Sequence, residues 1–340
     1  MSESGVTSLP PSSPAPPAIG GAVQVVSPDG VPEIAPGDDL AALLLPLVEL
    51  HDGDVLVVTS KVVSKAEGRV VAGERDDHLA AETVREVARR GPTRIVRNRL
   101  GLTMAAAGID ASNVVGGSVV LLPTDPDASA RALRRAVAER TGVNVGVVIT
   151  DTAGRAWRAG QTDIAIGAAG LRVLESFEGQ HDPHGNPLVV TAPAVADEIA
   201  GAAELAQGKL AARPCAVLRG RADLVLPAGQ DGPGAGSLIR PEGEDLFGLG
   251  ARAAVVAAVA GRSQDRAPFG APATAEDLLA AFAAAGIDAA PHGDGVVRCA
   301  AASAVPARIV AFAHGWHAAG PEASTADQED TDLLLVPATP

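Results

Sequence analysis

An apolar, β-branched run in residues 147–170 stops at two side chains that carry oxygen, Asp151 and Thr152. Polar and aromatic residues then follow at short intervals, namely Arg155, Trp157, Arg158, Gln161 and Asp163. A buried strand fixes the residues at its end, and a carboxylate and a hydroxyl fixed in this way are suitable ligands for a hard cation. Aspartate and threonine after a strand also occur in turns and helix caps. Because a turn explains Asp151 but not the polar residues behind it, we interpret this segment as a site.

Two earlier segments also place polar side chains after apolar stretches. In residues 53–65 a buried strand is followed by two hydroxyls and two ammonium groups, those of Ser60, Lys61, Ser64 and Lys65. Such groups at positions i and i+4 suit a chain of phosphates, although taken alone the segment is better explained as a helix start with solvated lysines. Residues 98–113 place Asp110 and Asn113 in a loop after small residues, where an Asx turn is an equally good explanation.

A fourth segment, residues 197–209, contains an amphipathic helix that is predicted to end at Gly208. Asp197 and Glu198 in its first part are predicted to be exposed carboxylates on a surface helix. Gln207 and Lys209 occupy the polar turn at the end of the helix and are better candidates for ligand contacts.

These polar segments need strands and helices to hold them. The apolar spacing predicts helices over residues 38–50, 79–90, 125–140 and 194–207, and strands over residues 23–26, 55–59, 94–96, 119–122, 145–149 and 214–219. Residues 182–185, Asp-Pro-His-Gly, are a turn signal, so the flanking segments are expected to form a hairpin and not a βαβ crossover. The predicted fold class is therefore α+β, with mixed β-sheets and flanking helices.

The chain has 340 residues, enough for two or three domains. Residues 1–21 are rich in serine and proline and poor in large apolar side chains, so they are predicted to be a disordered leader. Residues 22–250 are expected to form the main domain, which can divide into two subdomains, and residues 251–272 a helix and a linker. Residues 273–340 are expected to be a small module of unknown role with an acidic tail that contains Glu322, Asp327, Glu329, Asp330 and Asp332.

The composition excludes several classes of function. A net charge of -14 opposes binding to nucleic acid or to an anionic membrane surface. Cys215 and Cys299 lie far apart and form no C-x-x-C pair, which argues against a disulfide framework or a cysteine zinc site and fits a reducing cytoplasm. Neither a secretory signal nor an apolar stretch of about 18 residues is visible, so we expect a cytoplasmic protein that does not span a membrane.

Four motifs, TSKVVSK, AAAGIDASN, ITDTAGRAWRAGQTD and VADEIAGAAELAQGK, closely resemble those of the gamma-glutamyl ligases of coenzyme F420 biosynthesis in their actinobacterial form. The resemblance runs from about residue 25 to residue 250. It implies the gamma-glutamyl ligase fold for residues 22–250 and an intertwined homodimer. It also implies an enzyme that uses GTP and Mg²⁺ or Mn²⁺ to join L-glutamate to the lactyl carboxylate of a deazaflavin precursor, and then adds further gamma-linked glutamates. A monovalent cation is allowed as an additional ligand.

The same motifs imply the residues of the site. The implied metal ligands are Asp110, Asp151 and Thr152. The implied nucleotide contacts are Val31, Pro32, Glu33, Ile34, Ser60, Lys65 and Asn113, with Gln207 and Lys209 at the end of the helix. Archaeal members carry a glutamate in that last turn, near the metals. Lys209 stands there in this chain, so the resemblance does not extend to a fourth, acidic metal ligand.

The implied reaction proceeds through an acyl phosphate. The carboxylate is activated by the gamma-phosphate of GTP, and the amine of glutamate then displaces phosphate, while two cations that bridge the phosphates neutralise developing charge. Arg155 and Arg158 are the first candidates for gripping substrate carboxylates, ahead of Arg97 and Arg99. The alternative for Arg155 and Arg158 is an ion pair with Asp163 or Glu175.

Two other functions stay open at this point. The same residues would suit a regulatory protein that binds metal and nucleotide without turnover, or a metal-dependent phosphohydrolase that uses water as the acceptor. Many actinobacterial members continue into a flavin-binding nitroreductase domain. Residues 262–340 lack the arginine-rich and aromatic features of such a domain, so FMN binding is not expected.

Overall fold

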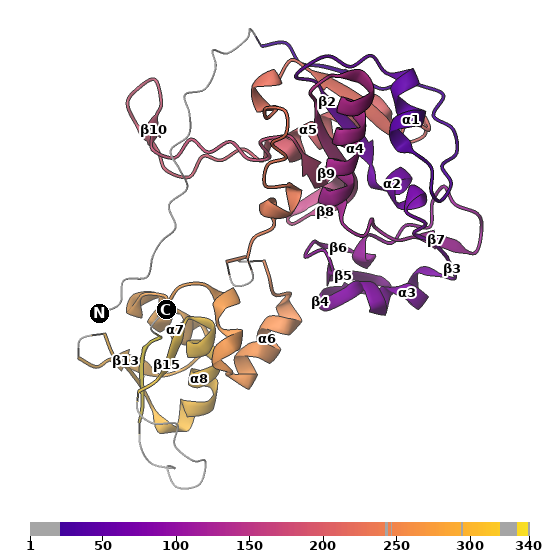
Figure 1. Cartoon of the computed structure of the whole chain (residues 1–340). Helices are drawn as coiled ribbons and strands as arrows, with labels where there is room; N and C mark the ends of the chain where they lie inside the picture. Colours follow the sequence, from indigo (N-terminus) through magenta and orange to yellow (C-terminus); the bar gives the residue numbers. More distant parts are fainter. Residues whose placement is uncertain (1–20, 242–243, 246, 294, 320–331, 339–340) are drawn as a thin grey trace. The chain divides into compact units, whose positions relative to one another are not determined.

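The computed structural model describes residues 21–241, 244–245, 247–293, 295–319 and 332–338 (Figure 1). The chain forms two compact units: the first comprises the chain up to Ala80 and Gly108–Leu238, the second Ala81–Ala107 and the chain from Ile239 onward. Each unit contains both helices and strands, which confirms the α+β class. The predicted leader lies outside the described residues except for Gly21, and the predicted acidic tail lies outside them except for Asp332.

A five-stranded sheet forms the centre of the first unit. Its order is β1 (Gln24–Val26), β12 (Cys215–Arg219), β2 (Val55–Thr59), β8 (Gly146–Arg155) and β9 (Arg158–Ala169). β2 and β8 are parallel, whereas the other neighbours are antiparallel, so the sheet is mixed as predicted. Leu56, Val57, Val147 and Val148 alternate between the two faces of the sheet and are all fully buried. Both faces are therefore covered, which explains the unbroken apolar runs of β2 and β8.

Two long helices pack on this sheet. α5 (Val195–Gln207) contributes Val195, Ile199 and Ala203 to the core cluster that also contains Val57 and Val148. α4 (Pro126–Thr141) contacts β8 and β9. It begins where the side chain of Asp125 accepts from the Ala128 amide at 2.9 Å, and it ends at Gly142 in the left-handed conformation. Both helices match their predicted ranges to within one residue at each end, and glycine follows the last residue of each, Gly142 after α4 and Gly208 after α5.

A buried arginine of α4 holds the glycine-rich loop of residues 230–236. Arg134 is 5% exposed and donates to the carbonyls of Val145 (2.9 Å) and Gln230 (2.8 Å) and to Asp231 Oδ1 (3.0 Å). Asp127 of the same helix accepts from the amide of Ala235 at 2.8 Å. The loop is therefore fixed to α4 by charge-assisted hydrogen bonds at both of its ends.

The predicted helix over residues 79–90 is wrong in its second part. α3 (Arg75–Glu82) ends early, and β4 (Thr83–Arg90) follows directly. β4 pairs with β5 (Thr93–Asn98), and β5 pairs on its other side with β6 (Thr103–Ala105). The β-branched residues Thr83, Val84 and Val87 favour a strand, and the ladder with β5 supplies hydrogen bonds that a local helical pattern cannot reveal.

The predicted end of the strand at Ile149 is also wrong. β8 continues through the polar residues to Arg155 and forms a hairpin with β9, in which Thr152 pairs with Asp163. The turn between the strands contains Trp157 in the left-handed region, with φ 61°. The segment behind Asp151 is therefore a long two-stranded arm and not a loop.

The second unit contains a four-stranded antiparallel sheet in the order β13 (Ala289–Pro291), β14 (Val297–Cys299), β16 (Leu333–Pro337) and β15 (Trp316–Ala318). Phe282, Trp316 and Leu335 are fully or almost fully buried in its core, between the sheet and two helices, α7 (Ala275–Ala284) and α8 (Ala304–Ala313). α6 (Ala251–Ala260) contacts α8 and β4.

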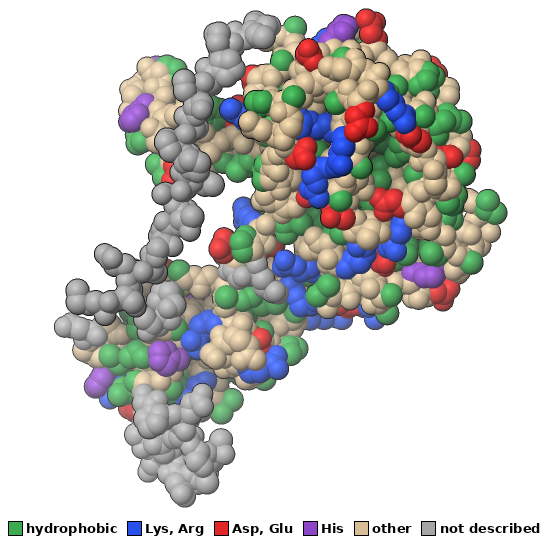
Figure 2. All heavy atoms as spheres, viewed as in Figure 1, with side chains coloured by type: hydrophobic (Ala, Val, Ile, Leu, Met, Phe, Trp, Pro, Cys, Tyr) green, Lys and Arg blue, Asp and Glu red, His purple; other side chains and the backbone are tan. Residues whose placement is uncertain are grey.

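The remaining elements of the first unit are short. They include the helices α1 (Leu40–Leu44) and α2 (Ser60–Ala66) and the 3-10 turns Leu45–Leu47, Ala222–Leu224 and Ala235–Leu238. β3 (Val70–Ala72) pairs antiparallel with β7 (Ser118–Val120), and β10 (Gln180–His181) forms a hairpin with β11 (Pro187–Leu188). The predicted hairpin around residues 182–185 is confirmed. None of the described helices is both long and apolar enough to cross a bilayer. On the face drawn in Figure 2, acidic and basic side chains are interspersed.

Candidate functional site

A cavity of about 580 Å³ in the first unit is bordered by residues from all four polar segments. All the predicted metal and nucleotide residues line it, namely Val31, Pro32, Glu33, Ile34, Ser60, Lys65, Asp110, Asn113, Asp151, Thr152, Gln207 and Lys209. Lys61, Thr150, Asp163, Glu204 and Arg213 line it as well. Side chains that lie up to 183 positions apart along the chain (31 to 214) therefore share one cavity.

Asp151 lies next to the start of α2 because β2 and β8 are parallel neighbours and β2 runs directly into that helix. The Ser60 hydroxyl donates to Asp151 Oδ1 at 3.0 Å. Burial, with repulsion from Asp163 and Asp110, raises the pKa of Asp151 to about 7 against the opposing effect of the Ser60 hydrogen bond. A bound cation would offset this repulsion.

Asp163 faces the same cavity from β9. It is buried and accepts from the hydroxyls of Thr150 (3.1 Å) and Thr152 (2.7 Å), two residues of β8 that point to one side of the strand. The ammonium of Lys209 donates to the oxygen of Thr152 at 3.0 Å, and the amide of Asp163 donates to Glu204 Oε2 at 3.3 Å. The Thr152 hydroxyl is thus held from two sides.

Asp110 contributes another carboxylate to the lining of the cavity. Lys61 Nζ lies 2.6 Å from Asp110 Oδ2 and donates to Ser112 Oγ at 2.7 Å. The Ser112 amide also donates to Asp110, at 2.7 Å. Although burial opposes it, the ammonium of Lys61 and the bonds from Ser112 hold the pKa of Asp110 below its usual value.

Lys65 and Gln207 give the cavity a positive charge and a hydrogen-bond donor that suit a polyanion. Lys65 is almost fully buried and forms an ion pair with Glu33. Gln207 is 4% exposed, and its Nε2 atom has no hydrogen-bond partner among the described residues. Buried donors are nearly always paired, so the unpaired amide of Gln207 leaves a donor available to a ligand acceptor.

Lysine is used in this chain only at the cavity. The 27 basic residues comprise 24 arginines and 3 lysines. The three lysines are Lys61, Lys65 and Lys209, and all three line the cavity. An ammonium group is a compact point charge that arginine does not reproduce, so this distribution favours a function for the ammonium groups in holding phosphates or orienting acidic ligands.

The oxygen-rich lining fits a hard cation that arrives with a nucleotide. No group of three histidine, cysteine, aspartate or glutamate side chains among the described residues is arranged to hold a metal ion alone. Mg²⁺ is typically bound by one or two carboxylates, with phosphate oxygens and water as the other ligands. Asp110, Asp151 and Thr152 match that pattern as a partial set of donors, to be completed by phosphate.

The predicted carboxylate-binding arginines lie elsewhere. Arg155 and Arg158 are exposed at the end of the β8–β9 hairpin, outside the lining of the cavity, and Arg155 donates to the Ala159 carbonyl at 3.2 Å. Neither forms the alternative ion pair with Asp163 or Glu175.

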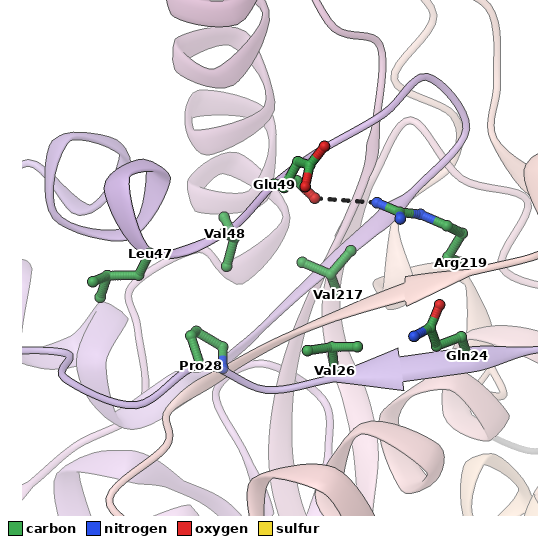
Figure 3. Close-up of a pocket in the computed structure, with 8 residues that line it drawn as sticks. All are labelled: Gln24, Val26, Pro28, Leu47, Val48, Glu49, Val217 and Arg219. Atoms are coloured by element: carbon green, nitrogen blue, oxygen red, sulfur yellow. Dashed lines mark hydrogen bonds between the residues drawn. The ribbon is translucent and has the colours of Figure 1, made fainter.

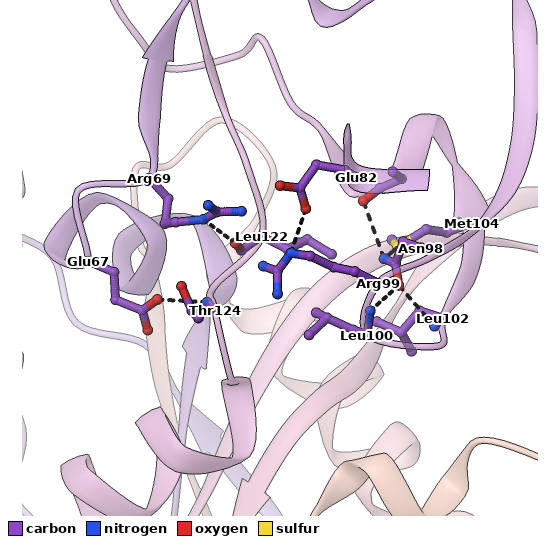
Figure 4. Close-up of polar contacts among 11 residues, drawn as sticks. Glu67, Arg69, Glu82, Asn98, Arg99, Leu100, Leu102, Met104, Leu122 and Thr124 are labelled. Carbon is purple, nitrogen blue, oxygen red and sulfur yellow. Dashed lines mark hydrogen bonds and ion pairs between the residues drawn. The ribbon is translucent and has the colours of Figure 1, made fainter. Parts of the chain in front are cut away.

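The two lower-ranked candidates, Arg97 and Arg99, belong to the second unit. Figure 4 shows that the guanidinium of Arg99 lies beside Glu82, and their Nε and Oε2 atoms are 2.7 Å apart. The neighbouring Asn98 is buried and accepts from the amides of Leu100 and Leu102, which shapes the turn after β5. The surroundings of Arg99 are therefore those of a structural ion pair.

Sequence reasoning gave no role to Glu204 or Arg213, which also line the cavity. The sequence could have identified Glu204 as a lining residue, because it lies three residues before Gln207 and therefore on the same face of α5. No local sequence pattern points to Arg213, since its ion pair with Asp29 joins two segments that are far apart in the chain.

A second hollow lies at the edge of the sheet, where β1 is the outer strand. Figure 3 shows its lining, which is mainly apolar and includes Val26, Leu47 and Val217. Arg219 spans it, donating to the Glu49 carbonyl at 3.1 Å, and pairs with the buried Asp54. Its volume of about 190 Å³ and its single satisfied guanidinium make it a poor binding site for a nucleotide.

Comparison with known proteins gives a consistent result. The family model of F420-0:Gamma-glutamyl ligase matches residues 30–220. The chain is 44% identical over 206 residues to the Coenzyme F420:L-glutamate ligase of Archaeoglobus fulgidus, which covers 55% of this chain and 83% of the relative. The ligases of that name from Methanopyrus kandleri (41% over 209 residues; 55% and 83%) and Haloarcula marismortui (38% over 223 residues; 58% and 87%) are similar too. The matched range contains the cavity and four of the five strands of the central sheet, all except β1, and the chain belongs to the F420-0:gamma-glutamyl ligase family of enzymes.

Proposed function

We propose that this protein is a ligase that uses GTP and Mg²⁺ or Mn²⁺ to join L-glutamate to the lactyl carboxylate of the deazaflavin precursor of coenzyme F420. Further gamma-linked glutamates are then added to the first. The observation that supports this proposal most directly is the cavity in which three lysines, the acidic pair Asp110 and Asp151 and the unpaired amide of Gln207 lie together. The names of the similar ligases supply the acceptor and the amino acid.

The reaction is a phosphoryl transfer followed by an acyl transfer. The bond between the β–γ bridging oxygen and the γ-phosphorus of GTP breaks, and a carboxylate oxygen of the acceptor binds that phosphorus, which gives GDP and an acyl phosphate. The amine of glutamate then forms the amide bond, loses a proton and displaces phosphate. A bound divalent cation would neutralise charge on the phosphates, and the carboxylates of Asp110 and Asp151 would hold it.

The residues of the chain bind and orient the reactants in this scheme. Lys61 and Lys65 supply positive charge at the phosphates, and Gln207 donates to the nucleotide from a buried position. Asp163 orients the hydroxyls of Thr150 and Thr152 by accepting a hydrogen bond from each. We also propose the gamma-glutamyl ligase fold and an intertwined homodimer, and sedimentation velocity tests whether the chain is a dimer.

A product assay tests the function. The full chain is incubated with GTP, Mn²⁺, L-glutamate and the deazaflavin precursor, and the products are measured by mass spectrometry. The proposal requires GDP together with a product heavier by one glutamate residue, and neither product should form with Asp151→Ala. Phosphate release without glutamate would favour a phosphohydrolase, and tight GTP binding without GDP formation would favour a regulatory protein. Either result contradicts the proposal.

A further inference from the structure

We propose that the ammonium group of Lys209 takes the place of one divalent cation, so that the cavity binds one divalent cation with each nucleotide and not two. This inference rests on the proposed function, because it concerns the cation that accompanies GTP. It revises the expectation of two bridging cations that followed from the chemistry of phosphoryl transfer.

The end of α5 places Lys209 at the cavity. The helix ends at Gln207, and Gly208 has φ 65° and ψ 135°, a left-handed conformation that redirects the chain. The Gly208 amide still donates to the Glu204 carbonyl, at 2.9 Å, which closes the last turn. The next residue, Lys209, extends its ammonium group to Thr152 Oγ1 on β8, at 3.0 Å.

The Thr152 oxygen is already engaged by this contact. Its single proton is donated to Asp163 Oδ1 at 2.7 Å, so its lone pairs serve as acceptors for Lys209. Those lone pairs are what a metal ion would use if Thr152 were its ligand. The ammonium therefore occupies the position of a cation on this hydroxyl.

Charge is distributed unevenly between the two sides of the cavity. On the Thr152 side, the Asp163 amide donates to Glu204 Oε2 at 3.3 Å, and the ammonium of Lys209 lies on the Thr152 hydroxyl that donates to Asp163. A divalent cation added on Thr152 would lie a few ångströms from the ammonium and would be repelled by it. On the other side, Asp151 accepts from the Ser60 hydroxyl at 3.0 Å and from the Thr152 amide, and none of the ion pairs of the described residues includes it. The Asp151 side is therefore where a single divalent cation is needed.

The number of bound cations tests the inference. The full chain is dialysed to equilibrium against Mn²⁺ and guanosine 5′-[β,γ-imido]triphosphate, and Mn²⁺ and nucleotide are counted per chain, with a protein-free chamber to correct for Mn²⁺ bound to the nucleotide alone. We expect one Mn²⁺ per nucleotide in the natural protein. Lys209→Glu replaces the ammonium by a carboxylate, and we expect two. Lys209→Gln removes the charge only, and we expect a second Mn²⁺ that binds more weakly than in Lys209→Glu.

Arg213→Gln is the matched control. Arg213 also lines the cavity, but its guanidinium is paired with Asp29, with Nε and Oδ1 2.7 Å apart. Its loss should leave one Mn²⁺ per nucleotide. Two Mn²⁺ in the natural protein, or one in Lys209→Glu, would overturn the inference while leaving the proposed function intact. Failure to bind either nucleotide or Mn²⁺ would contradict both.

Discussion

Lys65 keeps an ammonium group almost completely buried beside a glutamate that is largely exposed; the side chains of Lys65 and Glu33 are 8% and 82% accessible. Burial of a charge is costly unless a partner offsets it, and one exposed carboxylate is a weak partner. The arrangement is better explained if phosphate is the second partner.

We expect Lys65→Met to weaken binding of the GTP analogue at least tenfold, since a buried charge-assisted contact is lost. Lys65→Arg should not restore binding, because a planar guanidinium does not fit the place of a compact ammonium. Isothermal titration calorimetry measures both affinities. Arg131→Met, which removes an arginine on α4 whose nearest acidic partner is 3.9 Å away, serves as the control. Undiminished affinity in Lys65→Met would show that phosphate does not reach Lys65.

Asp151 gives the metal-free protein a characteristic pH dependence. Its pKa is about 7 in the folded chain, whereas an aspartate in an unfolded chain titrates near 4. Between these values the folded state holds a proton that the unfolded state has released, so this group lowers the free energy of unfolding as the pH rises from about 4 through 7.

The asparagine of Asp151→Asn cannot ionise, so this variant should not lose stability as the pH rises. In the presence of a chelator the variant should match the natural protein near pH 4 and exceed its stability at pH 8, by on the order of a few kcal/mol. Urea unfolding at a series of pH values measures the difference. A difference that does not change with pH would show that Asp151 is ionised in the folded protein throughout this range.

At the scale of elements, α4 both covers the sheet and holds the loop after β12. Arg134 is the link, because its guanidinium donates to carbonyls of the loop and of residues 226–227 from a buried position. We expect Arg134→Met to lower the free energy of unfolding by about 3–5 kcal/mol, since the acceptors of a buried charge are left unpaired. Arg131→Met, one turn earlier and more exposed, should cost less than about 1 kcal/mol. Chemical denaturation distinguishes them, and equal losses would refute the role of Arg134.

Elements whose ends are encoded locally were predictable from the sequence. α4 begins where Asp125 and Pro126 predict, and α5 ends where Gly208 predicts. β4 and the outer part of β8 were not predictable, because their strand character depends on pairing with β5 and β9. Asp197 was wrongly predicted to be exposed: it is half-buried and accepts from the Ala165 amide at 2.9 Å, and burial raises its pKa.

The residues of the site also divide into those that the sequence could predict and those that it could not. Polar residues at strand and helix ends identified the lining of the cavity, since parallel neighbours such as β2 and β8 bring those ends together. Arg155 and Arg158 lie in the β8–β9 hairpin, outside the lining of the cavity, and no local sequence pattern predicts that hairpin. The contacts of Lys209 with Thr152 and of Asp163 with both threonines are tertiary and needed coordinates.

At the scale of the whole molecule, the two tryptophans report on different units. Trp316 is 2% exposed in the core of the second unit and donates to the Ala273 carbonyl at 2.8 Å, whereas Trp157 in the first unit is 87% exposed. Trp316→Ala should cost about 3–5 kcal/mol of stability in the second unit, and Trp157→Phe less than about 0.5 kcal/mol.

Fluorescence of the remaining tryptophan and circular dichroism together measure these effects. In Trp316→Ala, circular dichroism should show unfolding of the second unit at a lower denaturant concentration. In Trp157→Phe, the emission of Trp316 should show the same unfolding midpoint as in the natural protein. A Trp316→Ala protein as stable as the natural one would show that the core of the second unit does not depend on this side chain.

The second unit is assembled from two separate stretches of chain, Ala81–Ala107 and the chain from Ile239 onward. During translation the ribosome adds all of residues 108–238 between them. At roughly 5–20 residues per second, β4, β5 and β6 wait on the order of ten seconds before the helices and strands that complete their unit emerge. Over that interval the nascent chain displays β4, β5 and β6 without the rest of their unit, and this is the stage of biosynthesis at which a chaperone is most needed.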